Sequence, residues 1–417
     1  MKKSLVLMAM AGVALAGCVN DVADVTQIQE QKKAYISFET PVSYANGESR
    51  ANFYGEIGIH KLENSTGGKY DGTYSYPTIE NFVVFAKRYV TEKPWSDLAN
   101  FWNNGNDASL EVFYDSEQNA WTPAKKHAWP DDSKLVFAAY SPSDLKPYAS
   151  DNVATKAENE EREQELEDNY TGNPSASVNE FGVGISDFKV ADNPACQFDL
   201  LYTRITDPVD QNYAMNPGQG QYYGTTLVFN HALTSIHFAV KKPESLATHS
   251  IVLKKLKLLD VKNEGGFEVN DPSEFSINDP SKQNVTWTLK NNKVDYPVFD
   301  GSLEFPYDKA AHVGENGGYP LLVLPQSTEN IVLYVEYTVD SQDKSCYVDM
   351  KSATGQSGQS VVNITNWFPG YRYVYNLMYS AAANDFIYFN PTTVPWTNVD
   401  VNIDLSKAPT ERPTLGN

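Results

Sequence analysis

The sequence predicts an all-β protein built from two tandem β-sandwich domains. Segments in which every second residue is apolar recur along the chain, helical spacing is scarce, and Gly, Pro, Asn and Asp separate the segments. Hydrophobic residues make up 41% of the chain and aromatic residues 12%, which is enough for folded cores. At roughly 100 to 200 residues per domain, a chain of 417 residues has room for two sandwiches.

The first 18 residues have the order of an export signal. Lys2 and Lys3 precede a short apolar run, and the run ends in small residues followed by Cys18. This run is too short to span a membrane comfortably, as is usual for secretory signals. The tetrapeptide that ends at Cys18 resembles the lipobox of bacterial lipoproteins, which implies that Cys18 becomes the acylated first residue. The alternative is an ordinary signal peptide with a chance cysteine.

The composition of the remaining chain limits its membrane attachment, its cysteine chemistry and its partners. No other apolar run approaches the ~20 residues of a spanning helix, so we expect a soluble body that a lipid anchor holds at the outer membrane. The chain has three cysteines, and the two besides Cys18, Cys196 and Cys346, either form a disulfide or stay as thiols. With 53 acidic and 33 basic residues, a net charge of −20 argues against nucleic acid as a partner.

Alternation marks a strand near each end of the chain. Near the start, Ile36 and Phe38 alternate with other residue types within segment 34–40. Near the end, apolar residues take every second position and Asp or Asn lies between them, in a candidate strand formed by Val399, Val401, Ile403 and Leu405. Pro409 follows where strand pairing should stop.

Further strands are expected between these two. Their ranges are 55–61, 81–87, 110–114, 134–140, 199–206, 226–240, 250–261, 320–324, 331–339, 346–350, 371–379 and 385–389. Two segments break the pattern. Residues 94–105 carry Trp95, Leu98, Phe101 and Trp102 at helical spacing, which predicts a short helix packed on a core. Residues 155–168 are rich in Glu and predict a solvated loop or an exposed helix.

The search for catalytic or cofactor chemistry is negative. The sequence has no nucleophile elbow, phosphate loop, dinucleotide fingerprint, paired-cysteine zinc site or calcium loop. His231 and His237 would share a face of one strand, but adjacent zinc ligands on a strand are more commonly two residues apart. We therefore assign no metal, no cofactor and no catalytic residue. Carboxylates are so numerous that no acid and base pair stands out, which leaves a glycosidase unsupported.

Several short strings, in this order, resemble the fimbrillin family. The family comprises pilins and pilus-associated lipoproteins of Bacteroidetes, also called type V pili, and the likeness spans roughly residues 199 to 396 together with the lipobox. The strings are Asp199-Leu200-Leu201-Tyr202, Phe229-Asn230-His231-Ala232-Leu233-Thr234, Ile236-His237-Phe238, Leu324-Pro325-Gln326, Trp367-Phe368-Pro369-Gly370-Tyr371, and Phe389-Asn390-Pro391 with Trp396.

The resemblance implies a domain plan. It implies transthyretin-like sandwiches, here an N-terminal domain at 51–242 and a C-terminal domain at 243–417, after a signal at 1–18 and a pro-segment at 19–50. It also implies that a trypsin-like, Arg-specific protease cuts between Arg50 and Ala51. The alternative for Arg50 is a solvated side chain in a polar loop.

The cut predicts a mechanism of assembly. Removing residues 19–50 would take away the first strand and leave a groove with unsatisfied backbone groups and an apolar floor. A strand donated by a neighbouring subunit would fill the groove, and the best donor is segment 397–406. Head-to-tail repetition would then build a filament. The alternative is that this segment is simply the final strand of the second domain.

Three classes of function remain. The first is a surface pilus (fimbria) subunit that serves adhesion, with other pilin subunits, the outer membrane, an Arg-specific protease and a host receptor or glycan as partners. The second is a monomeric carbohydrate-binding lipoprotein that would stack sugars on Trp121, Trp129 and Tyr222-Tyr223. The third is a hydrolase with unrecognised carboxylates.

Overall fold

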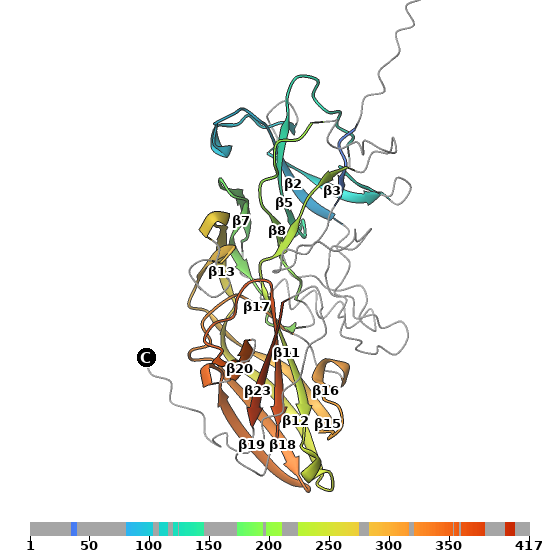
Figure 1. The fold of residues 1–417 in the computed structure, drawn as a ribbon, viewed down its shortest axis with the longest axis vertical. Helices are drawn as coiled ribbons and strands as arrows, with labels where there is room; N and C mark the ends of the chain where they lie inside the picture. Colours follow the sequence, from blue (N-terminus) through green and yellow to red (C-terminus); the bar gives the residue numbers. More distant parts are fainter. Residues whose placement is uncertain are drawn as a thin grey trace, which may run out of the picture.

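The computed structural model confirms an all-β protein. It describes residues 35–39, 81–102, 108–115, 120–123, 125–145, 173–194, 197–210, 224–274, 283–316, 321–352, 354–357, 360–379 and 397–404. Within these ranges the strands form four sheets, and the helical elements are short 3-10 turns. No helix among them is long and apolar enough to cross a membrane. The molecule is elongated, with the N-terminal sheet at the top of Figure 1 and the C-terminal sheets at the bottom.

The N-terminal sheet has eight strands in the order β10-β8-β5-β2-β3-β4-β1-β9. Its members are β1 (Phe38–Glu39), β2 (Asn81–Arg88), β3 (Ser109–Asp115), β4 (Ala120–Pro123), β5 (Leu135–Ser141), β8 (Leu201–Thr203), β9 (Thr225–Thr226) and β10 (Phe229–His231). All pairs are antiparallel except β1 with β9. The expected strands at 81–87, 110–114 and 134–140 are confirmed.

A four-stranded sheet joins the two halves of the chain. Its order is β14-β13-β7-β6, with β6 (Ser175–Val178), β7 (Val183–Lys189), β13 (Glu264–Val269) and β14 (Val285–Leu289). The central pair, β7 and β13, brings together segments from before and after Lys242. In Figure 1 these two strands lie between the top and bottom of the molecule.

The C-terminal half has two sheets. The first has the order β16-β11-β22-β23-β20-β21, with β17 also paired to β11, and the second has the order β15-β12-β18-β19. The first comprises β11 (Thr234–Lys241), β16 (Ala311–His312), β17 (Leu321–Val323), β20 (Thr354–Ser357), β21 (Ser360–Asn363), β22 (Tyr371–Met378) and β23 (Thr397–Asp404). The second comprises β12 (Ile251–Lys262), β15 (Lys293–Glu304), β18 (Val332–Val339) and β19 (Gln342–Asp349).

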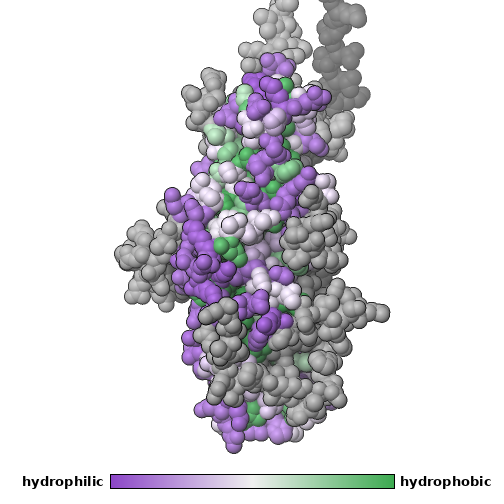
Figure 2. All heavy atoms as spheres, turned by 90° about the vertical axis from the view of Figure 1, so that its left-hand side faces the viewer, coloured by the Kyte–Doolittle hydropathy of each residue, from purple (hydrophilic) through white to green (hydrophobic). Residues whose placement is uncertain are grey.

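Burial follows the sequence pattern where a strand has one face in a core. Ile331, Leu333, Val335 and Tyr337 are buried as the alternation predicts. By contrast, β11 and β22 are buried along their whole length, and they form a parallel pair. Parallel strands are usually covered on both faces. Hydrophilic side chains cover most of the described surface seen in Figure 2, and apolar residues occur there only in small patches.

Two sequence predictions were wrong in detail. The described part of this segment, residues 94–102, is not one continuous helix, because Trp95–Asp97 makes a 3-10 turn (η1) and Asn100 then forms a bridge with Lys87. The predicted core packing is confirmed for Trp95, Leu98 and Trp102, which are buried. The predicted single strand at 226–240 is divided between β10 and β11, which belong to different sheets.

The expected domain boundary after Lys242 stays a prediction. The sheets place β11, which ends at Lys241, with strands of the C-terminal half, and they pair β13 with β7. A strand from before Lys242 thus belongs to a C-terminal sheet, and a strand from after Lys242 pairs with one from before it. The strand candidates at 55–61 and 385–389 and the Glu-rich segment at 155–168 lie outside the described residues.

Candidate functional site

The N-terminal strand lies inside the first sheet. Phe38 pairs with Trp121 of β4 on one side and with Thr225 of β9 on the other. The Ile36 backbone N–H donates to the His127 carbonyl at 2.8 Å, and the Thr225 N–H donates to the Ser37 carbonyl at 2.8 Å. Residues 35–39 therefore complete a backbone ladder between β4 and β9.

The side chain of Phe38 fills an aromatic cluster. Its ring meets Phe82 at 5.9 Å and Phe137 at 5.3 Å between centroids, both in edge-to-face geometry. The Phe82 ring also packs against Trp121 and Phe229, each at 5.4 Å. Phe38 is 1% exposed, so removal of this strand would uncover an aromatic floor.

The strand β9 depends on β1 for its place in the sheet. It is the terminal strand of the sheet order, and within the described chain it pairs only with β1. Gly224, just before β9, has a φ of +90°. A Cβ there would lie 2.8 Å from the backbone nitrogen of Phe38, so the close approach requires glycine. Withdrawal of β1 would leave β9 without its described partner.

Basic side chains lie near β1. Burial lowers the pKa of His127, with a smaller contribution from Lys125, so its imidazole is neutral at physiological pH. The same imidazole packs edge-on against Trp102 at 5.1 Å. At the solvent boundary, the Lys126 ammonium lies 5.7 Å from the ring centroid of Tyr35. The described residues of this site are suited to holding a strand.

The last strand has a place in the C-terminal half of its own chain. β23 lies between β22 and β20, parallel to β22 and antiparallel to β20. Val399, Val401 and Ile403 pair in register with Tyr373, Tyr375 and Leu377. The hairpin β20–β21 joins this sheet through β23. The backbone position fits the final-strand alternative, and donation to a neighbour stays a prediction.

The residues predicted for processing lie elsewhere. Cys18, Arg50, Ala51 and the last predicted donor residue, Leu405, are outside the described residues. Cys196 is also outside them. Cys346 is a buried free thiol in β19, and burial raises its pKa to about 12.

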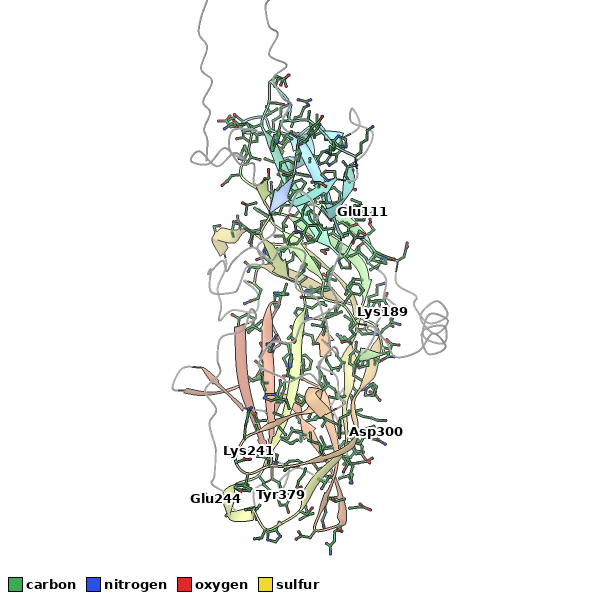
Figure 3. The ribbon with its side chains drawn as sticks, turned by 90° about the vertical axis from the view of Figure 1, so that its right-hand side faces the viewer. Glu111, Lys189, Lys241, Glu244, Asp300 and Tyr379 are labelled. Carbon is green, nitrogen blue, oxygen red and sulfur yellow. The ribbon has the colours of Figure 1, made fainter. Side chains whose placement is uncertain are left out.

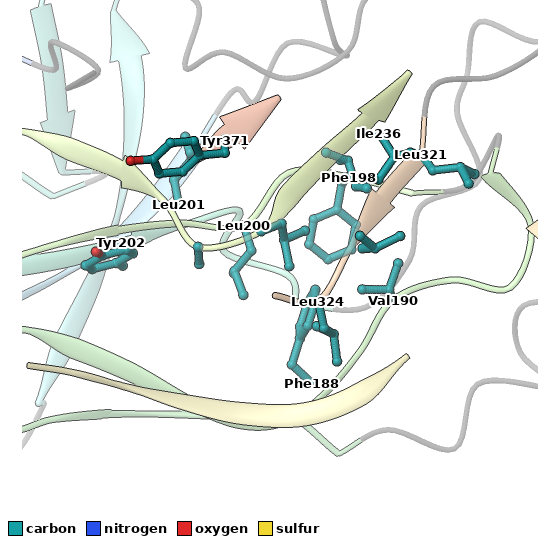
Figure 4. Close-up of a cluster of buried hydrophobic side chains, with 14 of the residues drawn as sticks. Phe188, Val190, Phe198, Leu200, Leu201, Tyr202, Ile236, Leu321, Leu324 and Tyr371 are labelled. Atoms are coloured by element: carbon teal, nitrogen blue, oxygen red, sulfur yellow. The ribbon is translucent and has the colours of Figure 1, made fainter. Parts of the chain in front are cut away.

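A junction between the halves brings together several of the strings that suggested the family. The Leu233 carbonyl accepts the Gly370 N–H at 2.8 Å, and the Thr234 hydroxyl donates to the Phe368 carbonyl at 2.7 Å. The Trp367 N–H donates to the Gln326 carbonyl at 2.8 Å. Figure 4 shows the apolar packing beside these contacts, with side chains from strands of both halves in one cluster.

A buried polar pair lies in the same junction. Asp199, just before β8, contacts the imidazole of His231 in β10. Asp199 is fully buried, and this desolvation raises its pKa, although His231 opposes the shift. The pair joins two strands of one sheet at the end nearest the C-terminal half.

Other chemistry that was considered finds little support among the described side chains. No group of three His, Cys, Asp or Glu residues there could hold a metal. His231 and His237 lie in different sheets. Trp121 is 2% exposed and Trp129 is 4% exposed, so neither offers a face for stacking sugars. Tyr222 and Tyr223 lie outside the described chain.

Comparison with known families decides the relationship. Residues 89–396 match the sequence model of a family described as Fimbrillin-like. The chain belongs to this fimbrillin-like family. The resemblance inferred from the short strings is therefore confirmed, and several of the strings that the structure describes meet at the junction. A search of curated proteins finds no match for this fimbrillin-like protein.

Solved structures similar to this fimbrillin-like protein include three from Bacteroides and related bacteria. A fimbrial protein from Bacteroides vulgatus has 14% identity and a TM-score of 0.43, covering 82% of this chain and 95% of that one. A protein from Bacteroides uniformis, described as a candidate for cell adhesion, has 14% identity and a TM-score of 0.39, covering 83% and 93%. Another so described, from Parabacteroides distasonis, has 12% identity and a TM-score of 0.37, covering 91% and 98%. Because these identities and scores are low, membership rests on the family match.

Sequence reasoning missed the partners of the first strand. Alternation at Ile36 and Phe38 predicted a strand, but nothing local linked it to Gly224 and Thr225 almost two hundred residues later. The Gly224-Thr225-Thr226 sequence is a weak signal, in which a glycine precedes two β-branched residues.

Proposed function

We propose that this fimbrillin-like protein is a structural or accessory subunit of a cell-surface pilus that serves adhesion. Export with acylation of Cys18 would deliver it to the outer membrane. Its body would consist of two transthyretin-like sandwiches, as in the family it resembles. Cleavage after Arg50 would then remove residues 19–50 and open the place that β1 occupies.

The single observation that supports this proposal best is the position of β1. This strand is short, yet it lies between two neighbours and covers an aromatic floor. Ile36 and Phe38 are each 1% exposed. Burial of each is worth roughly 1.5 to 3 kcal/mol, so an emptied groove has a strong preference for another apolar strand. A neighbouring subunit could satisfy both the ladder and the floor.

Segment 397–406 is the donor that we propose. Its four alternating apolar residues, Val399, Val401, Ile403 and Leu405, match the requirement for side chains that point to one floor. At roughly 1.5 to 3 kcal/mol each, they could offset the ordering of an extended segment. Donation requires that β23 first leaves β22 and β20, so exchange has to compete with a place in its own chain.

The test uses residues 19–417 without acylation, treated with trypsin at low ratio. Intact mass would report cleavage, and light scattering with electron microscopy would report polymers. We expect one early cut after Arg50, followed by filaments, and neither for Arg50→Ala. Arg162→Ala is the matched control, because Arg162 lies in a different polar segment, and it should behave as the parent chain does.

Two results would contradict the proposal. Filaments that form equally well from the Arg50→Ala chain would exclude control by this cut. A clean cut that leaves a stable monomer would argue against strand exchange, and it would favour a subunit that works without polymerising.

A further inference from the structure

One face of the β11–β22 pair is polar although it is buried. In the parallel register Arg372 stands opposite Ser235, and Asn376 stands opposite Ala239. Side chains alternate between the two faces of a strand, so these four residues share a face with His237. We call the surface formed by these five residues the polar face. Arg372 is 1% exposed, His237 is 2% exposed and Asn376 is 4% exposed, so water does not satisfy their polar groups.

The unpartnered atoms of the polar face are all hydrogen-bond donors. Nε and Nη1 of Arg372 are buried and have no hydrogen-bond partner, and the same is true of Nδ2 of Asn376. A guanidinium carries five N–H donors and no acceptor, and the amide nitrogen of asparagine only donates. Among the side chains that the structure describes, none pairs with Arg372 as a counter-ion. The polar face therefore has a surplus of donors over acceptors.

Other polar groups of this face have partners. Oγ of Ser235 and Nε2 of His237 lie 2.7 Å apart and form a hydrogen bond. Lys241, farther along β11, donates to the Asp308 carbonyl at 3.3 Å. Figure 3 shows Lys241 near Tyr379, at the end of the strand pair. The unpartnered donors thus come from β22, and the second cation of the face has an acceptor of its own.

The charges that act on the polar face are positive. Burial lowers the pKa of His237, and Arg372 and His312 add to the shift. Burial lowers the pKa of His312 to about 4, and Lys309 adds to that shift. No carboxylate contributes to either change. Both imidazoles are therefore neutral at physiological pH. A guanidinium that has lost its hydration is unfavourable unless an anion pairs with it.

We propose that the polar face binds one small oxyanion, a carboxylate or a phosphate, between Arg372 and Asn376. These two residues are four apart in β22, a span of ~13 Å along a strand. His237 stands opposite Val374, at the midpoint of that span. The long side chain of Arg372 covers part of the distance, and an oxyanion would accept hydrogen bonds from the guanidinium on one side and from the amide on the other. The planar guanidinium matches carboxylate and phosphate oxygens, which a spherical chloride ion does not offer.

Arg204 shows how a guanidinium of this protein is satisfied without a ligand. Its Nη1 donates to the Asn270 carbonyl at 2.8 Å, and its Nη2 donates to Oδ1 of Asn284 at 3.1 Å. Arg204 is half-buried. It therefore provides a matched control for Arg372, as an arginine whose acceptors belong to the described chain.

The test starts from the uncleaved chain 19–417, unfolded and refolded in chloride alone so that no oxyanion is retained. Urea unfolding is then measured with added sodium acetate or sodium phosphate at constant ionic strength. For a dissociation constant of ~1 mM, raising the oxyanion from ~1 to ~20 mM should lower the unfolding equilibrium constant about tenfold. Chloride should not reproduce this effect. A response to acetate alone or to phosphate alone would identify the oxyanion within the proposed class.

Two variants locate the response. Asn376→Asp places a carboxylate on the polar face, so we expect it to be at least as stable as the parent in chloride and to lose the response to added oxyanion. Arg372→Gln should lose the response as well. Arg204→Met should be less stable than the parent and keep the tenfold response. Equilibrium dialysis with the labelled anion that stabilises the parent should find one anion per parent chain and none per Asn376→Asp chain.

Three results would overturn the proposal. One is a parent chain whose unfolding responds to neither oxyanion, because Arg372 would then be satisfied within the chain. Another is an equal response in Asn376→Asp and in the parent. The third is loss of the response in Arg204→Met. If Arg372→Gln does not fold, the comparison of Asn376→Asp with Arg204→Met still decides. All measurements precede cleavage, so the result does not depend on Arg50 or on strand exchange.

Discussion

Gly224 and Phe38 approach so closely that a Cβ on Gly224 would lie 2.8 Å from both the backbone nitrogen and the carbonyl carbon of Phe38. This contact joins the start of the sequence to a segment that precedes β9. Because β9 is the terminal strand of the sheet and pairs with β1, the fit at Gly224 determines whether β1 is covered on both sides.

Gly224→Ala should weaken the packing of β1 against β9. The φ of +90° is unfavourable for any residue with a Cβ, and the new methyl group would meet backbone atoms that cannot rotate away. We expect a loss of about 2 kcal/mol or more in the free energy of unfolding, measured in urea. Trypsin should also cut after Arg50 faster than in the parent chain.

Gly301→Ala is the control for this prediction. A Cβ at Gly301 would approach the ring of Phe299, with 3.1 Å as its shortest contact, and a ring can shift more easily than backbone. We expect a smaller change in stability and an unchanged rate of cleavage. An equal loss in the two variants would show that the approach to Phe38 is not the cause.

Phe38→Ala should lower the stability of the intact chain and leave that of the cleaved chain unchanged. In the intact chain the substitution leaves a cavity among Phe82, Phe137 and Trp121, and we expect a loss of about 3–5 kcal/mol in urea unfolding. Removal of residues 19–50 makes the parent and the variant identical, so any difference between them should vanish after cleavage. Tyr35→Ala, at a side chain that is 52% exposed, should cost far less.

Alternation predicted strands that have one buried face, and β18 is the clearest example. It failed, among others, at two strands that contain Gly or Pro. β13 contains Gly265, where a Cβ would lie 2.6 Å from the Thr288 carbonyl oxygen, so glycine permits close pairing with β14. β15 contains Pro297, which is tolerated because β15 is at the edge of its sheet. Neither reason is visible in a local sequence pattern.

The change of sheet between β10 and β11 was also hidden from the sequence. Ala232 and Leu233 are both apolar and completely buried, so hydropathy marks no break at the point where the chain changes sheets. The backbone shows the change, because the Ala232 N–H donates to the Leu200 carbonyl while Thr234 starts a pairing with Val323. For the same reason, the strings that suggested the family did not reveal that several of them meet at a junction.

The stability of the C-terminal half should depend on the protonation of His312. Burial lowers the pKa of this imidazole to about 4, and Lys309 adds to the shift, whereas an unfolded histidine titrates near its ordinary value of 6.5. The unfolded chain therefore binds a proton first as the pH falls. The stability that neutral His312 provides is present above about pH 6.5 and is lost progressively as the pH falls toward 4.

The comparison of the parent chain with His312→Gln isolates this effect, since glutamine is polar and does not titrate. Other acid-sensitive groups are common to both chains, so they cancel in the difference between the two free energies of unfolding. This difference should be constant above about pH 7, and it should shift by about 3 kcal/mol against the parent between pH 6.5 and 4. Urea unfolding at several pH values would measure it. A difference that stays constant over that range would mean that His312 is accessible to protons in the folded protein, and the polar face around His237 and Arg372 would then be less dry than its burial indicates.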